Sequence, residues 1–63
     1  MDIQYKEISL EQALFLYDSG FRDFQEKNRS RDKYDSNCLL NQDGMDERSV
    51  SFWSRYRLFV PVE

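Results

Sequence analysis

The sequence predicts a small α+β fold in which one helix packs on a mostly antiparallel sheet, in the order β-α-β-β-β. Two observations lead to this prediction: a helix pattern with clear ends at residues 10–19, and stretches of alternating apolar and polar residues before and after it. Because a chain of 63 residues supports only one core, we place a single domain at residues 1–63.

The helix is predicted from its start, its apolar face and its end. Ser9 can accept a hydrogen bond from the first helical turn, and Gln12 three residues later completes a capping box. Gly20 suits the left-handed position that ends a helix, after which Phe21 can return to touch Leu16. Apolar residues follow the spacing of one helix face, at Leu10, Ala13, Leu14 and Tyr17.

Strands are predicted on both sides of this helix. Residues 3–8 alternate in polarity and lead directly into the helix cap. The chain after the helix contains a wholly polar segment, Lys27–Lys33, and a turn signal at Asp43-Gly44. Further strands are therefore expected at residues 22–26, 34–40 and 49–60.

The last predicted strand has two different faces. Alternation would turn Phe52, Tyr56 and Leu58 toward the helix, while Pro61 would end the ladder. The outward face would carry Trp53, Arg55, Arg57 and Phe59.

Cysteine and histidine usage excludes several kinds of site. The single cysteine, Cys38, permits no intramolecular disulfide and argues for a reducing compartment. Histidine is absent, which excludes zinc sites of the Cys/His kind and Ser-His-Asp catalysis. We expect a cytoplasmic protein that is not an enzyme and has no cofactor, no metal and no membrane span. So short a chain buries little surface alone, which favours a homodimer or a stable complex.

Charge is distributed in blocks along a chain whose net charge is −3. Residues 1–26 and 34–47 carry a surplus of acids, whereas residues 27–33 and 48–63 carry a surplus of bases. We expect the basic loop, the outward face of the last strand and the acidic turn at 43–47 to contact a partner, since Trp and Arg are common in binding hot spots. The predicted partner-binding residues are Lys27, Arg29, Arg31, Lys33, Trp53, Arg55, Arg57 and Phe59.

Three alternatives to this prediction stay open. Arginines interleaved with aromatic rings are also typical of platforms for single-stranded nucleic acid, so nucleotide or nucleic-acid binding is a second hypothesis. An accessory structural subunit, whose partner supplies missing core, is a third. The simplest interpretation is a solvated loop and strand arginines that pair with acids on a neighbouring strand.

The opening segment Tyr5-Lys-Glu-Ile-Ser-Leu-Glu-Gln-Ala-Leu14, with Gly20 closing the helix, resembles the start of many very small tailed-phage proteins. The aromatic, arginine-containing end, Trp53-Ser-Arg-Tyr-Arg-Leu-Phe59, is similar to the way those proteins finish. The resemblance implies a non-enzymatic inhibitor that binds a host protein, such as an anti-CRISPR or anti-restriction protein. It assigns no functional residues.

Overall fold

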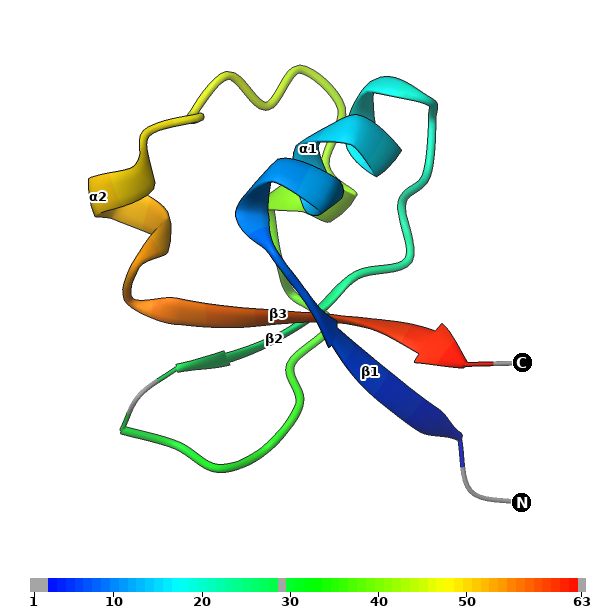
Figure 1. The fold of residues 1–63 in the computed structure, drawn as a ribbon, viewed down its shortest axis with the longest axis vertical. Helices are drawn as coiled ribbons and strands as arrows, with labels where there is room; N and C mark the ends of the chain where they lie inside the picture. Colours follow the sequence, from blue (N-terminus) through cyan, green and yellow to red (C-terminus); the bar gives the residue numbers. More distant parts are fainter. Residues whose placement is uncertain (1–2, 29, 63) are drawn as a thin grey trace.

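A three-stranded antiparallel sheet with a helix above it forms the architecture of this computed structural model, which describes residues 3–28 and 30–62 (Figure 1). The α+β class predicted from the sequence is confirmed. In chain order the elements are β1 (Gln4–Ile8), α1 (Leu10–Asp18), β2 (Gln25–Asn28), the short 3-10 helix η1 (Leu39–Asn41), α2 (Val50–Trp53) and β3 (Tyr56–Val62).

The last strand occupies the centre of the sheet. β3 pairs with β1 on one side, with Lys6 opposite Val60, and with β2 on the other side, with Lys27 opposite Arg57. Pro61 does not end the strand as expected, because β3 continues to Val62. The pairing with β2 reaches only as far as Phe59 of β3, so at Pro61 the strand has β1 alone beside it. The N–H that proline lacks is therefore not needed for a ladder on the β2 side.

Helix α1 forms as the sequence predicts, because its ends are satisfied by local groups. The Ser9 hydroxyl accepts a hydrogen bond from the Gln12 N–H at 3.1 Å. At the other end Gly20 has φ +100°, and the Phe21 N–H donates to the Leu16 carbonyl at 3.0 Å. This is the glycine-terminated ending expected from the sequence.

The segment after α1 departs from the prediction. The second strand begins at Gln25 rather than Arg22, so that Lys27 belongs to a strand and not to a loop. The reason is that the side chain of Asn41 takes both backbone groups of Phe24: its oxygen accepts from the Phe24 N–H at 2.8 Å and its nitrogen donates to the Phe24 carbonyl at 2.9 Å. The Asn41 side chain therefore makes the hydrogen bonds that a neighbouring strand would otherwise make with the backbone of Phe24.

The prediction of a strand at residues 34–40 is wrong for most of its length. Only Asp35 makes a ladder contact, an isolated bridge to Glu26, before the chain turns into η1. The strand expected at residues 49–60 is also wrong in its first half, which forms α2 instead. Ser49 caps α2 by accepting from the Phe52 N–H at 3.3 Å, a local interaction that outweighs the alternating pattern.

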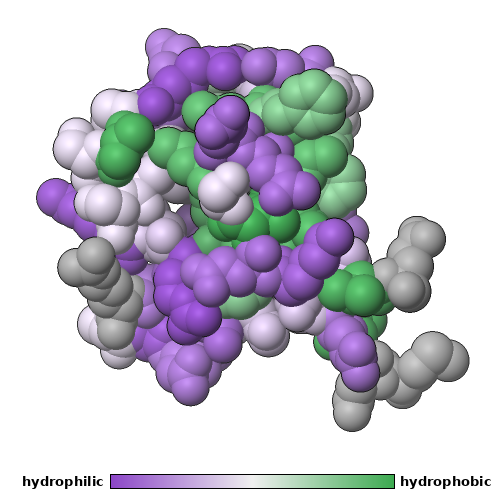
Figure 2. Space-filling model, in the orientation of Figure 1, coloured by the Kyte–Doolittle hydropathy of each residue, from purple (hydrophilic) through white to green (hydrophobic). Residues whose placement is uncertain are grey.

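The core lies between the sheet, α1 and the loops that join them. Phe24 and Leu40 are fully buried, and the Tyr17 hydroxyl donates to the Gln42 carbonyl at 3.2 Å while accepting from the Met45 N–H at 2.9 Å. These bonds hold the long loop against α1. Apolar side chains reach the surface on the face shown in Figure 2, bounded by hydrophilic ones. Other core residues are Ile8, Ala13, Cys38, Trp53, Leu58 and Val60.

Within the part of the chain that the structure describes, no helix is both long and apolar enough to cross a membrane.

Replacing Phe24 with Ala should lower the free energy of unfolding by about 3–5 kcal/mol, because this fully buried ring leaves a cavity. Phe15 on α1 is 68% exposed, so Phe15→Ala should change stability by less than ~0.5 kcal/mol. Urea unfolding of both variants measures the difference. Equal losses would contradict this position of the core.

The Cys38 thiol should resist alkylation in the folded protein. It is 1% exposed, and burial raises its pKa to about 12, so very little reactive thiolate forms. Iodoacetamide at about pH 8 should label the native chain slowly and the urea-unfolded chain rapidly, as followed by mass spectrometry. Equal rates would show that the segment around Cys38 is open.

Candidate functional site

The sheet brings the two basic segments of the sequence together. Lys27 on β2 lies opposite Arg57 on β3, and Arg55 and the loop after β2 both lie at this end of the two strands (Figure 1). Lys27, Arg31 and Arg57 line one hollow of about 310 Å³, which also contains Asp32. The fold therefore places the basic loop beside the last strand.

Several of these cations are already engaged within the chain. The Lys27 ammonium lies 3.2 Å from the Asp32 carboxylate and 4.4 Å from the centre of the Tyr34 ring, and only 17% of its side chain is exposed. Arg57 forms a two-point ion pair with Glu7, both contacts being 3.1 Å. The interpretation in which strand arginines pair with neighbouring acids is confirmed for Arg57.

Two of the aromatic residues expected on the outward face are buried. Phe59 does face away from α1, but Tyr34 covers it with a ring-to-ring distance of 5.1 Å, and its exposed fraction is 5%. Trp53 belongs to α2 rather than to the strand, is 3% exposed, and donates from its indole nitrogen to the Glu47 carbonyl at 2.7 Å. Neither ring can be a surface contact in this structure.

The remaining predicted cations keep exposed side chains. Arg31, Lys33 and Arg55 are exposed, and none of them forms an ion pair with another described residue. Arg29 lies outside the described residues. In the acidic turn at 43–47, Asp43 pairs with Arg22 at 3.2 Å and Met45 is buried.

Tyr56 lies where several hollows of the surface adjoin. This half-buried ring opens β3 directly after α2, and it lines three separate hollows. We call Tyr56 and these hollows the Tyr56 surface. The sequence suggested that Tyr56 would face α1, but its ring packs 5.9 Å from both Phe52 and Trp53 on α2.

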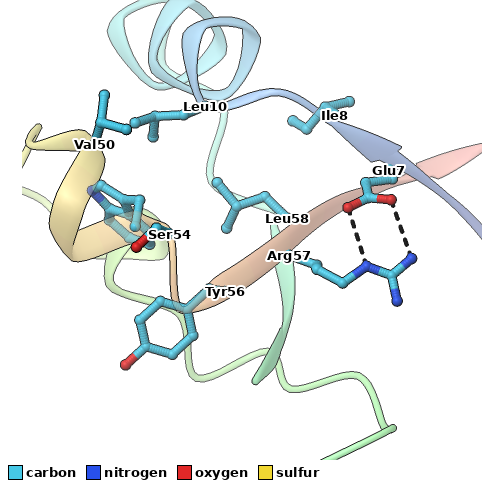
Figure 3. A pocket seen from close by; sticks show the side chains of 9 residues that line it. Glu7, Ile8, Leu10, Val50, Ser54, Tyr56, Arg57 and Leu58 are labelled. Carbon is cyan, nitrogen blue, oxygen red and sulfur yellow. Dashed lines mark hydrogen bonds and ion pairs between the residues drawn. The ribbon is translucent and has the colours of Figure 1, made fainter. Parts of the chain in front are cut away.

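The first hollow, of about 150 Å³, is apolar at its centre (Figure 3). Leu10 from α1, Val50 from α2 and Leu58 from β3 converge on it, and the Glu7–Arg57 ion pair lies at one side. Val50 is 74% exposed and adds apolar surface to this hollow.

The second and third hollows share Glu26. The second, of about 360 Å³, is polar and includes Arg31 and Lys33. The third, of about 260 Å³, lies between Glu26 and the rings of Phe52 and Tyr56, and we call it the aromatic hollow. It is completed by Asn37, Leu39, Gln42 and Trp53.

Glu26 has an unusual environment for a carboxylate. It is half-buried, and burial raises the pKa of this carboxyl above its ordinary value of 4.5; a hydrogen bond from Cys38 opposes the rise, and nearby Asp35 adds to it. Glu7 shows the opposite behaviour, because the hydrogen bond from Arg57 lowers its pKa. Glu26 is thus an acid whose charge the fold tolerates poorly.

Sequence analysis missed both central residues of this site. Tyr56 was assigned to the core because residues 49–60 alternate, although Ser49 followed by Phe52 and Trp53 also fits a capped helical turn. Glu26 carried no signal, because its burial arises from the segment that returns at Asp35 and Cys38.

No group of histidine, cysteine, aspartate and glutamate side chains suited to a metal ion occurs among residues 3–28 and 30–62. Comparison with protein families, with characterised proteins and with solved structures finds no match to this chain.

Replacing Glu26 with Gln should stabilise the protein at neutral pH. A raised folded-state pKa means that the protonated form contributes stability that is complete below 4.5 and is lost as pH rises through the folded-state pKa. The variant stays neutral throughout, so its melting temperature should exceed that of the parent at neutral pH and match it at acid pH.

Glu7→Gln is the matched control, with the opposite sign. In the parent, the lowered pKa of Glu7 means that this carboxylate contributes stability that is present above pH 4.5 and is lost as the pH falls. The Glu7→Gln variant lacks this contribution and should melt below the parent at neutral pH. Melting curves across the acid range test both variants. A Glu26→Gln variant that is less stable than the parent at neutral pH would contradict the assigned environment.

Proposed function

We propose that this protein is a non-enzymatic binding protein that engages a protein partner through the Tyr56 surface. The observation that carries the proposal is the half-buried Tyr56 ring, which lines three hollows and shares one of them with the exposed cations Arg31 and Lys33. Tyrosine and arginine next to concave, partly apolar surface are what binding hot spots use. The residues there offer rings, amides and charges, which suit recognition.

The expected partner is a host protein, and the expected effect is inhibition. This part of the proposal is supported by the resemblance to small tailed-phage proteins, through the strand, helix and glycine at the start of the chain. An anti-CRISPR, anti-restriction or host-takeover role fits a chain whose surface chemistry is that of a ligand for another protein. A cytoplasmic location belongs to the same proposal.

Nucleotide or single-strand binding is less well supported. Such a platform needs exposed rings beside unpaired arginines, yet Trp53 and Phe59 are buried and Arg57 is paired with Glu7. Self-association is a separate proposal, supported by the position of β1 at one edge of the sheet, where a second copy could add a strand.

Charge reversal at Arg31 and Lys33 together should weaken capture of a partner from bacterial lysate about tenfold or more, because the introduced carboxylates would repel the acidic groups that these cations attract. The protein should recover one partner in stoichiometric amount, identified by mass spectrometry. Light scattering on the purified chain and titration with labelled oligonucleotides separate the proposals of self-association and nucleic-acid binding.

Lys6→Glu is the matched control, since Lys6 is an exposed base that lines none of the hollows at Tyr56. It should capture the partner as the parent does. Absence of any stoichiometric partner, or equal loss in both variants, would overturn the proposed function.

A further inference from the structure

At two places in this chain a cation lies between an aromatic ring and an acid. The Arg22 guanidinium lies 3.8 Å from the centre of the Tyr17 ring and 3.2 Å from the Asp43 carboxylate. Lys27 takes the same position between Tyr34 and Asp32, at 4.4 Å and 3.2 Å. In both places a positive charge rests on a ring face while an acid neutralises it.

The aromatic hollow has the ring and the acid but no cation among the described residues that line it. Phe52 and Tyr56 lie 5.9 Å apart, with their planes inclined by 48°, and Glu26 is part of the same wall. None of the ion pairs between described residues includes Glu26. The hollow therefore presents negative charge and ring surface to whatever enters it.

From this arrangement we infer that the aromatic hollow receives the side chain of an arginine from the partner protein. A guanidinium is flat and can lie against a ring, and its fork of N–H groups suits a carboxylate with further acceptors beside it. Glu26 supplies the carboxylate, and Asn37 and Gln42, whose side chains carry amide oxygens, line the same space. A lysine ammonium would pair with the Glu26 carboxylate but could not stack flat against the aromatic rings.

The electrostatics of the hollow agree with a cationic guest. Burial and the neighbouring Asp35 raise the pKa of Glu26, and an arriving guanidinium would offset both effects. Arg31 and Lys33 do not line this hollow; they belong to the adjoining polar one. The volume of about 260 Å³ leaves space for one long side chain.

This inference rests on the proposed function, because it names the group that the partner would insert. The test uses an acetylated and amidated Gly-Arg-Gly peptide, with Gly-citrulline-Gly as an uncharged probe of nearly the same shape. Two-dimensional NMR of the labelled protein and Trp53 fluorescence report binding. The arginine peptide should shift the resonances of Glu26, Phe52 and Tyr56, and the citrulline peptide should bind at least tenfold more weakly.

Glu26→Gln should abolish the preference for arginine, while Asp32→Asn, at an exposed acid paired with Lys27, should keep it. Glu26→Gln is expected to fold, since it removes a poorly tolerated charge. Equal binding of the two peptides, or an unchanged preference in Glu26→Gln, overturns the inference.

The two proposals can fail separately. If capture of a partner depends on Arg31 and Lys33 while neither peptide binds, the proposed function stands and the arginine site is wrong. If the arginine peptide binds through Glu26 while no partner is recovered, the hollow is a guanidinium site and the proposed function is wrong.

Discussion

The pairing of β3 with both other strands is the interaction on which the rest of the structure depends. β1 and β2 do not pair with each other; within the sheet, each pairs with β3 alone. The last strand thereby joins segments from opposite ends of the chain, as the ion pair between Glu7 and Arg57, 50 residues apart, illustrates. Because the sheet cannot form before the final residues arrive, its closure depends on long-range contacts, which cost chain entropy. Truncation within β3 would leave the edges of β1 and β2 open at once.

The two sides of this sheet are filled very differently. On one side lie α1, α2 and the long loop held by Tyr17; on the other, Tyr34 reaches back over Phe59 and Tyr5 at ring distances of 5.1 and 4.5 Å. The cover on the first side is incomplete, because α2 has only one turn and leaves space where β3 begins. Tyr56 stands at that point. The site therefore exists because the short helix cannot cover the start of the central strand.

The parts of the fold that were predictable are those determined locally. The ends of α1 depend on Ser9 and Gly20, which lie within a few residues of the groups they satisfy, and both are evident in the sequence. The bonds from Asn41 to Phe24 span 17 positions, so the start of the second strand could not be predicted from its own residues. The same holds for the site. The basic segments could be found from composition, but not the burial of Trp53 and Phe59, since exposure is decided by distant segments that cover a ring.

The position of Glu26 links stability to recognition. Its backbone exchanges two hydrogen bonds with Asp35, at 2.9 and 3.0 Å, which hold the returning segment against β2 and draw the carboxyl into a half-buried position. A carboxylate in that position weakens the isolated fold, and a chain of 63 residues has little stability to spare. A binding site can require such a destabilising group, because function and stability trade against each other. An arriving guanidinium would neutralise the charge of Glu26 and cover the Tyr56 ring in one step. Binding would remove the destabilisation that Glu26 causes in the free protein, and this relief would contribute to the affinity for the partner.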